Sequence, residues 1–296
     1  MADLLQHVAP LADAQVAAKG ATDTAGCLVV ELHDLDDLRA AADVFSRVWA
    51  RADGEQIVPL EILRALTHAG NYAAGAFVDG RMVGAIAGFL GEFDGSRTLH
   101  SHIMGLVPDA RGRGIGFALK QHQRAWALDR DLATITWTFD PLVRANAYLN
   151  LTKLGAVAAT YLADFYGPMT DELNAGEATD RLLVTWEVAS PTAVLASHGQ
   201  PQTPDDAELR DAGAEVLLDE DAGGNPAAHA VRADRLLCHV PRDIFAVRRE
   251  RPELGHAWRH AVRDTLGAAI ADGFRAVAVT GSGSYLLERP DAELLA

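Results

Sequence analysis

The sequence has few of the features that mark several classes of protein. Its 296 residues include only two cysteines, Cys27 and Cys238, and their spacing matches no metal site. No apolar run reaches the length of a membrane-spanning helix, and the acidic, mixed N-terminus is unlike a signal peptide. Acidic residues outnumber basic ones, so the formal net charge is −15. This charge disfavours a general nucleic-acid binder. We therefore expect a cytoplasmic protein that uses no metal, no membrane and no nucleic acid.

The composition is typical of a globular chain that builds a large core. Apolar residues make up 49% of the sequence and charged residues 23%. The length allows one large domain or two modest ones. In so acidic a protein, an anionic ligand needs a local positive site.

Residues 98–130 are the most informative stretch. An apolar run that contains His100 and His102 ends at Val107 and predicts a strand, and Pro108 breaks it. A turn rich in glycine and arginine follows at 111–116, and apolar side chains then recur at helical spacing. The first turn of a helix has unpaired N–H groups, and its dipole favours an anion. The sequence therefore predicts a phosphate-binding turn between a strand and a helix.

The turn has the pattern Arg-x-x-Gly-x-Gly from Arg111. It is not a P-loop, because no Gly-Lys-Ser/Thr follows, and its Gly-x-Gly-x-Gly spacing does not fit the dinucleotide fingerprint. The strand, the Val-Pro pair, the turn and the amphipathic helix in series closely resemble the pyrophosphate loop of the GNAT acyltransferases. A tight turn without a ligand is the alternative. The resemblance implies that acyl-coenzyme A is bound by Leu106, Val107, Arg111, Gly112, Arg113, Gly114, Ile115 and Gly116.

The order of predicted elements extends the resemblance over about residues 27–190. It implies an α/β (α+β) GNAT fold, in which a mixed, mostly antiparallel, twisted sheet is flanked by helices. Residues 1–26 are expected to form a short helix or a loose arm. After the GNAT domain we expect a linker at 191–230 with one short strand, and a smaller C-terminal α/β extension at 231–296 packed on the GNAT domain.

Residues 144–156 resemble the last helix of GNAT domains. The resemblance implies contacts of Asn146 and Lys153 with coenzyme A. Leu151 stands where the family often has the tyrosine that protonates the departing thiolate. Tyr148, three residues earlier, lies on roughly the same helix face. It is either a substitute acid or a packing residue, and the thiol can also leave without an acid.

His100 and His102 are the candidates to remove the proton of the attacking amine, because a histidine titrates near neutral pH. The pair resembles the His-x-His of the arylalkylamine N-acetyltransferases. Counted back from Val107 it lies one residue further away, so it needs a compensating bulge to face the active side. The alternative is that one or both are packed in the core. His122 lies on the apolar stripe of its helix, and we expect it in the core.

The loop between the last two strands is the expected contact for the acceptor. Tyr166, Asn174 and Arg181 border it, and an arginine there could pair with a carboxylate. A solvated loop without substrate contacts is the alternative.

These features predict an acyl-CoA-dependent N-acyltransferase that uses acetyl-CoA and acts on the amine of a small molecule by direct transfer. The layout, including the sequence DELNAG at 171–176, resembles a bacterial group of predicted GNAT acyltransferases with a C-terminal extension. Members of that group are tied to N-succinylation of amino acids, so succinyl-CoA is an alternative donor. A protein N-acetyltransferase is a further option. A non-catalytic CoA-binding module is another, supported by Leu151. A homodimer is one option for the oligomeric state.

Overall fold

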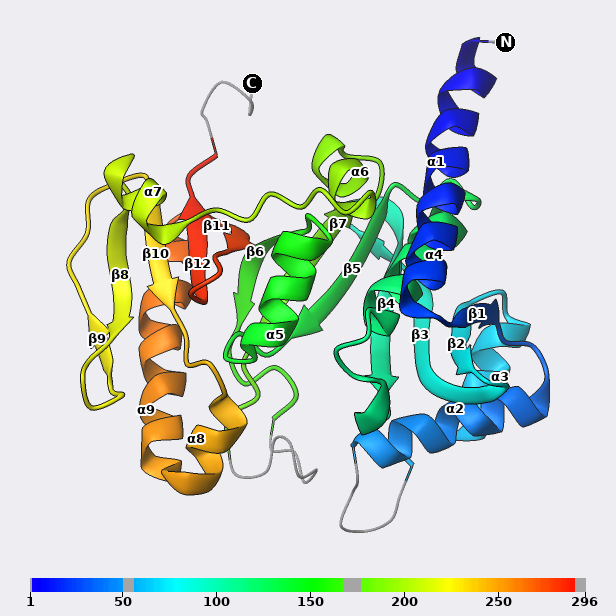
Figure 1. The fold of residues 1–296 in the computed structure, drawn as a ribbon, viewed down its shortest axis with the longest axis horizontal. Helices are drawn as coiled ribbons and strands as arrows, with labels where there is room; N and C mark the ends of the chain where they lie inside the picture. Colours follow the sequence, from blue (N-terminus) through cyan, green and yellow to red (C-terminus); the bar gives the residue numbers. More distant parts are fainter. Residues whose placement is uncertain (1, 50–55, 168–176, 291–296) are drawn as a thin grey trace. The chain divides into compact units, whose positions relative to one another are not determined.

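The computed structural model describes residues 2–49, 56–167 and 177–290, with the backbone alone for residues 2–9. The chain divides into two compact units. The first comprises Met1–Trp137, Thr170–Leu173 and Glu187–His198, and the second comprises Thr138–Met169, Asn174–Trp186 and Gly199–Ala296. Both combine helices with mostly antiparallel strands, so the predicted mixed α/β class is confirmed (Figure 1).

The first unit is built on strands that follow one another both along the chain and across the sheet. The strands are β1 (Leu28–Glu31), β2 (Tyr72–Val78), β3 (Arg81–Phe93), β4 (Ser96–Leu106) and the start of β5 (Thr134–Phe139). Neighbours from β1 to β4 pair antiparallel, whereas β5 pairs parallel with β4. The helices are α1 (Ala2–Ala25), α2 (Leu35–Val48), α3 (Leu60–His68), α4 (Ile115–Leu128) and α6 (Pro191–Ser197).

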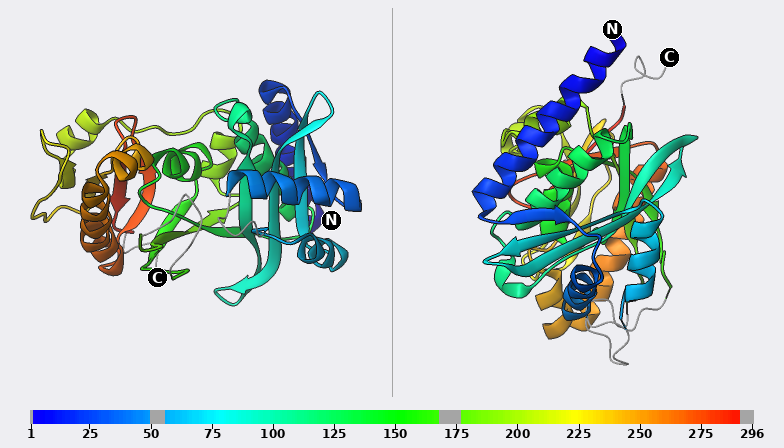
Figure 2. Two further views of the ribbon diagram at one scale, coloured as in Figure 1. Left: turned by 90° about the horizontal axis from the view of Figure 1, so that it is seen from below. Right: turned by 90° about the vertical axis from the view of Figure 1, so that its right-hand side faces the viewer.

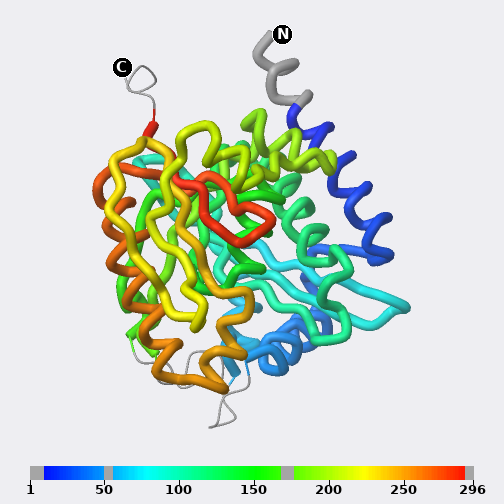
Figure 3. The backbone as a smooth tube through the Cα atoms, turned by 60° about the vertical axis from the view of Figure 1, so that its left-hand side comes forward, coloured from blue at the N-terminus to red at the C-terminus, as the bar shows by residue number. Residues whose placement is uncertain are grey.

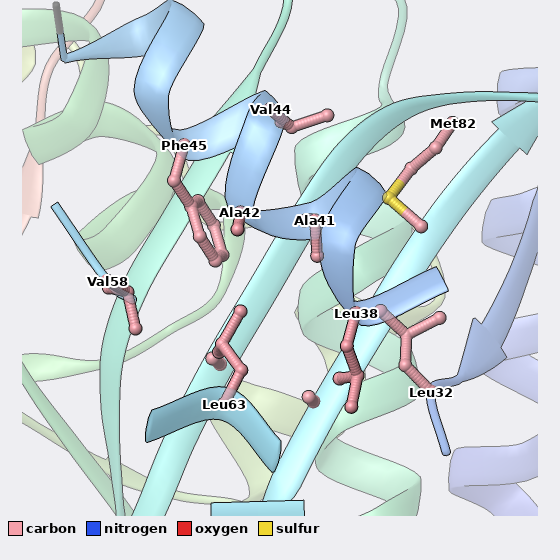
Figure 4. Close-up of a cluster of buried hydrophobic side chains, with 12 residues drawn as sticks. Leu32, Leu38, Ala41, Ala42, Val44, Phe45, Val58, Leu63 and Met82 are labelled. Atoms are coloured by element: carbon pink, nitrogen blue, oxygen red, sulfur yellow. The ribbon is translucent and has the colours of Figure 1, made fainter. Parts of the chain in front are cut away.

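The two faces of this sheet bury different helices. Along β3, Ala85 and Ala87 join the core formed with α2 and α3, which Figure 4 shows around Leu38 and Phe45. Gly84, one residue out of step, faces Leu119 of α4 instead. The helix α1 packs along α4 (Figures 2 and 3). Because successive residues of a strand point to opposite faces, this alternation fixes which side chains of the sheet meet α4.

Residues 1–26 were expected to form a short helix or a loose arm, and α1 is a helix of 24 residues. A buried arginine of α4 explains why it is held. Arg124, 0% exposed, donates to Oδ2 of Asp13 at 3.1 Å and to the carbonyl oxygen of Val188 at 2.6 Å. Asp13 also pairs with Nε2 of His198 at 2.6 Å. A polar contact far away in sequence, which no local pattern reveals, therefore anchors the N-terminal helix.

The second unit joins the end of the predicted GNAT region to the C-terminal half. Its strand order is β7-β6-β11-β12-β10-β8-β9. The strands are β6 (Val157–Leu162), β7 (Arg181–Glu187), β8 (Glu215–Glu220), β9 (Pro226–Ala228), β10 (Arg235–His239), β11 (Arg275–Val279) and β12 (Ser284–Glu288). The helices are α5 (Arg144–Ala147), the π-helix η2 (Tyr148–Lys153), α7 (Asp206–Asp211), α8 (Ile244–Glu250), α9 (Pro252–Val262), the π-helix η3 (Arg263–Gly267) and α10 (Ala268–Ala271). The strand β11 pairs antiparallel with β6 at Ala276 and Ala158, so both segments share one sheet. The predicted domain boundaries stay predictions.

Residues 191–230, expected to be a linker with one short strand, contain α6, α7, β8 and β9. Capping explains the two helices. The Ser190 hydroxyl accepts from the N–H of Ala193 at 3.2 Å, and the Asp205 carboxylate accepts from the N–H of Ala207 at 2.9 Å. Ser190 and Asp205 are therefore the N-caps of α6 and α7, and Pro191 is the first residue of α6.

Asp140 is the hub of a buried ion cluster in the second unit. Arg259, 2% exposed, donates to both of its carboxylate oxygens, at 2.9 and 2.7 Å, and Arg248 donates at 3.1 Å. Although burial alone would raise the pKa of Asp140, the charges and hydrogen bonds of Arg259, with Arg248, lower it from 3.8 to about 2. The folded pKa is depressed, so this stabilisation is fully present above about pH 3.8 and is lost as the pH falls towards 2.

Replacing Asp140 with asparagine should cost about 3–5 kcal/mol of unfolding free energy, because it leaves the buried charge of Arg259 with only the more distant carboxylate of Glu177, at 3.7 Å. Urea denaturation at pH 7 measures the change. The exposed pair Asp272–Arg289, whose side chains are 70% and 41% exposed, provides the control. Asp272→Asn should cost no more than about 1 kcal/mol. Equal losses in the two variants would contradict the assignment of Asp140 as a buried hub.

Candidate functional site

The strand β4 has a bulge at the two histidines. Ala87 of β3 pairs with Ile103, whereas the next residue, Gly88, pairs with Ser101, so His102 is an extra residue in β4. The histidine pair needed this kind of insertion to face the active side. Gly88 is fitted to the bulge: a Cβ atom there would lie 2.6 Å from the carbonyl oxygen of His100 and 3.2 Å from Cα of Ser101. Only glycine allows the two backbones to approach this closely.

The bulge gathers three rings. The centroid of Phe89 lies 5.1 Å from that of His100 and 5.8 Å from that of His102, and the two imidazole centroids are 6.5 Å apart. The structure therefore brings the two candidate bases together. It adds Phe89, which sequence reasoning missed. The turn Asp94-Gly95 could have revealed this residue, because a tight hairpin there places Phe89 opposite His100.

Both histidines are held in the neutral form at pH 7. His100 is half-buried, and its Nδ1 lies 3.1 Å from the hydroxyl of Thr136 on β5. Burial, then the charges of His102 and Lys120, lowers the pKa of His100 to about 4. Burial also lowers the pKa of His102, although this side chain is exposed. A neutral, accessible imidazole can accept a proton, and His102 fits that role better.

Lys120 of α4 lies buried beneath the bulge, with 2% of its surface exposed. Its Nζ donates to the hydroxyl of Ser101 at 2.9 Å and to Oε1 of Gln123 at 3.0 Å, and it sits 3.8 Å from the ring centre of Trp137. Burial lowers its pKa to about 7. Sequence reasoning missed this residue, because a lysine on a helix is nearly always exposed.

The glycine turn is open to solvent at the start of α4. Arg111, Gly112, Arg113 and Gly114 are all exposed. Gly112 and Gly114 have φ angles of +74° and +82°, a backbone region that favours glycine. Gly114 is the N-cap of α4, and no side chain caps the first-turn amides there. The chemistry fits a pyrophosphate group, because free N–H groups and two arginines face the solvent together.

The residues on either side of the glycine turn that were predicted to contact the cofactor differ in burial. Leu106 ends β4 and Val107 follows it, and both are half-buried. Nε of Arg111 approaches the carbonyl oxygen of Leu106 at 3.4 Å, which draws the arginine back towards the strand. Ile115 and Gly116 are buried, so any contribution they make to an anion site would come from their backbone N–H groups.

In the second unit, the last helix of the predicted GNAT region continues α5 as the π-helix η2. Asn146 and Lys153 are exposed on it. Tyr148 is half-buried, and its hydroxyl lies 3.5 Å from that of Thr203, too far for a good hydrogen bond. Leu151, in the position where the family often has its acid, is 1% exposed and belongs to the core.

The predicted acceptor residues of the second unit differ in exposure. Tyr166 is 43% exposed, and its hydroxyl lies 3.1 Å from that of Thr138. Arg181 is 8% exposed, lies 5.2 Å from the ring centre of Tyr166 and donates to the carbonyl oxygen of Asp180 at 2.9 Å. Little of its guanidinium is open to an acceptor. Asn174 and the sequence at 171–176 lie outside the described residues.

His122, expected in the core, is half-buried, and its Nδ1 lies 2.8 Å from the hydroxyl of the buried Tyr72 in the first unit. The side chains of Trp126, Trp137 and Trp258 are buried. Within residues 2–49, 56–167 and 177–290, no helix is long and apolar enough to cross a membrane. The same residues contain no cluster of three or more side chains suited to hold a metal ion.

Comparison with protein families decides which kind of turn this is. Residues 35–155 match the model of the acetyltransferase (GNAT) family, a range that includes β4, the bulge, the glycine turn and α4. The chain contains a GNAT acetyltransferase domain. The predicted resemblance is thereby confirmed, and the GNAT domain makes the protein an N-acyltransferase with acetyl-CoA or another acyl-CoA as co-substrate.

Solved structures of GNAT proteins resemble the chain over about half of its length. The ribosomal-protein-S18-alanine N-acetyltransferase from Escherichia coli has 18% identity and a TM-score of 0.45, covering 55% of this chain and 95% of its own. A GNAT acetyltransferase from Streptococcus pneumoniae has 18% identity and a TM-score of 0.45, covering 54% and 98%. Arabidopsis thaliana Naa50, in complex with the bisubstrate analogue CoA-Ac-MVNAL, has 17% identity and a TM-score of 0.43, covering 54% and 97%. No curated protein matches the chain.

Proposed function

We propose that the GNAT domain transfers the acetyl group of acetyl-CoA directly to the amine of a small molecule, with His102 as the proton acceptor. The observation that supports this most is the bulge in β4, which holds two neutral imidazoles and Phe89 together on the strand that leads into the glycine turn. Acyl transfer to an amine requires a neutral base and a site for the donor, and here one strand carries the histidines and leads into the turn suited to pyrophosphate.

Binding of the donor is assigned to the first-unit turn. The N–H groups that follow Gly112 and Gly114, with the positive charges of Arg111 and Arg113, would hold the pyrophosphate, and the end of β4 would lie along the thioester arm. When bound, the coenzyme supplies an activated acyl group. Holding both reactants in place can lower the barrier by about 7–11 kcal/mol.

Proton removal is assigned to His102. The amine must be neutral to attack, and His102 is exposed and unprotonated at pH 7. As the carbon–nitrogen bond forms and the carbon–sulfur bond breaks, the amine proton passes to His102, directly or through water. The thiolate leaves with the electron pair of the carbon–sulfur bond. His100, beside His102, is also neutral at pH 7.

Tyr148→Phe should leave turnover almost unchanged, because we propose that no protein acid protonates the thiolate. Among the described residues, the hydroxyl of Tyr148 has only the long 3.5 Å contact with Thr203 to orient it, and Leu151 on the same helix is buried. Steady-state rates from pH 6 to 10 measure the effect. A loss of roughly 10²-fold or more at unchanged CoA affinity would show instead that Tyr148 is the acid.

A matrix of donors and amines tests the function as a whole. Acetyl-CoA and succinyl-CoA are each combined with amino acids, polyamines and short peptides, and release of free thiol is recorded. We expect turnover with acetyl-CoA and small amines. A clear preference for succinyl-CoA would show the alternative donor, and peptides alone as acceptors would show a protein N-acetyltransferase.

Binding without turnover would identify a non-catalytic module. Thermal unfolding with acyl-CoA separates this case from loss of binding, since ligand at about 100 times its dissociation constant should add about 2.7 kcal/mol of stability. Stabilisation without thiol release for any amine would contradict the proposed enzyme.

A further inference from the structure

Among the described residues, no carboxylate is in contact with the buried Nζ of Lys120. This Nζ donates hydrogen bonds to two neutral groups, the hydroxyl of Ser101 and the amide oxygen of Gln123, and lies over the neutral ring of Trp137. Burying a lysine this way is costly, and a buried amine of this kind usually has a task beyond packing. The contact to Ser101 is the informative one, because Ser101 is one of the two bulge residues.

We propose that Lys120 is a positioning residue for acyl transfer, which ties the histidine bulge of β4 to α4 and sets the charge next to the histidine pair. The inference rests on the proposed function of His102. It adds a residue buried at 2% exposure, which would act through Ser101 and through its charge rather than by contact with donor or acceptor.

The hydrogen bond from Lys120 to Ser101 joins two parts of the first unit, the bulge of β4 and the helix α4, whose relative position matters for transfer. The N-terminus of α4 is formed by the glycine turn, and Lys120 lies further along the same helix. Its bond to Ser101 fixes the bulge relative to that helix, and therefore fixes His102 relative to the turn. Since a displacement of about 1 Å at the reacting groups can cost roughly 10²-fold in rate, such a tie affects turnover more than donor binding.

The charge of Lys120 also acts on His100. The side chains grouped around His100 are Phe89 on β3, His102 on β4 and Thr136 on β5, and Lys120 on α4 acts on it electrostatically. Of these, His102 and Lys120 can be charged, and both lower the pKa of His100, after the larger effect of burial. The pKa of Lys120 is about 7, so its ammonium is present below that pH, where the histidines would otherwise gain a proton.

Removing the ammonium should therefore let the pair bind its first proton at higher pH. The two imidazole centroids lie 6.5 Å apart, so a proton on one ring opposes protonation of the other, and the shift at His100 also affects the protonation of His102. The acidic limb of the rate profile should move upward, because a base that is already protonated cannot accept the amine proton. A purely structural lysine would not move this limb.

Three variants separate the effect of the Lys120–Ser101 hydrogen bond from the effect of the ammonium charge. Lys120→Met removes both and is expected to lower kcat roughly 10- to 100-fold, with the KM for acyl-CoA little changed and the acidic limb moved upward. Ser101→Ala removes the hydrogen bond from Lys120 and keeps the ammonium, so kcat should fall while the acidic limb of the pH–rate profile stays in place. Gln121→Leu is the control on the same helix. Gln121 is fully buried and makes no hydrogen bond among the described residues, and we expect neither change.

A titration of His100 does not depend on turnover, so its result can be separated from the test of the proposed function. The ring protons of His100, identified by their loss in His100→Gln, are followed by NMR in the wild-type protein and in Lys120→Met. We expect a higher pKa for His100 in the variant, whatever the acceptor is. If Lys120→Met does not fold, Lys120→Gln, which keeps a polar donor of smaller size, takes its place in both measurements.

The outcomes are distinct. An unchanged His100 pKa together with an unchanged acidic limb overturns the proposal, as does a loss of kcat that Gln121→Leu reproduces. A changed His100 pKa in a protein with no acyl transfer to any amine supports the assignment of the charge and rejects the proposed function alone. A shift of both the pKa and the limb supports the proposal.

Discussion

His102→Ala should lower kcat by roughly 10²–10⁴-fold while the affinity for acyl-CoA stays the same. The imidazole is the exposed, neutral base of the β4 bulge, and the donor is assigned to a different part of the strand and turn. The loss should appear in kcat, because the proton is removed as the bond to the amine forms. Steady-state kinetics and calorimetry with CoA measure the two quantities.

The pH dependence of the rate should show protonation of His102 as a loss of activity at low pH. Burial lowers the pKa of His102 below 6.5, so the wild-type rate should hold from neutral pH downward and fall only below that value. In His102→Ala this acidic limb should disappear or pass to another group. His100→Ala, at a half-buried position with a pKa of about 4, should cost less than His102→Ala.

An exposed histidine serves as the matched control. His68 lies at the end of α3 and is exposed, so His68→Ala should keep the wild-type rate and profile. If His102→Ala and His100→Ala both turn over as fast as His68→Ala, neither histidine is the base, and the bulge has only a structural role.

Local signals made the GNAT fold and the glycine turn predictable. A strand that ends at Val107, a proline, glycines with positive φ and a helix with an apolar stripe all act within a few residues of one another. The hairpin at 281–284 has the same local character, because Gly-Ser-Gly-Ser joins the antiparallel strands β11 and β12 there. These are short-range effects, and a sequence displays them directly.

Long-range polar contacts were not predictable. The sequence could state that the histidines need a bulge, but the bulge depends on Gly88 of the neighbouring strand. Lys120 and Arg124 look like surface residues of an amphipathic helix, yet they are 2% and 0% exposed, because their partners come from β4, α1 and the segment near residue 188. Burial of a charge depends on distant partners, which a single sequence does not reveal.

Gly114→Asp should abolish measurable binding of CoA. Gly114 is the N-cap of α4 in the proposed pyrophosphate turn, and it is exposed. An aspartate there would place a negative charge where the phosphates should be held and would counter Arg111 and Arg113. Space is available for the side chain, since a Cβ atom at Gly114 would have only Cβ of Ala25 within 4 Å, at 3.7 Å. The fold should therefore survive, with calorimetry and circular dichroism as the two measurements.

Backbone strain is the rival explanation, because Gly114 has a φ angle of +82°. Gly95 has a φ angle of +69° in the turn between β3 and β4, and a Cβ atom there would meet nothing within 4 Å. Gly95→Asp therefore imposes similar strain and the same charge away from the glycine turn. Gly114→Asn adds nearly the same volume without the charge, and asparagine tolerates this backbone region better than most residues.

The three variants give a graded result if the turn holds pyrophosphate. Gly95→Asp should bind CoA as the wild-type protein does, Gly114→Asn should bind it more weakly, and Gly114→Asp should not bind it. The difference between the two Gly114 variants should shrink at high salt, because the charge contribution is screened while the steric one is not. Wild-type affinity in a folded Gly114→Asp protein would remove the turn at 111–116 from the donor site.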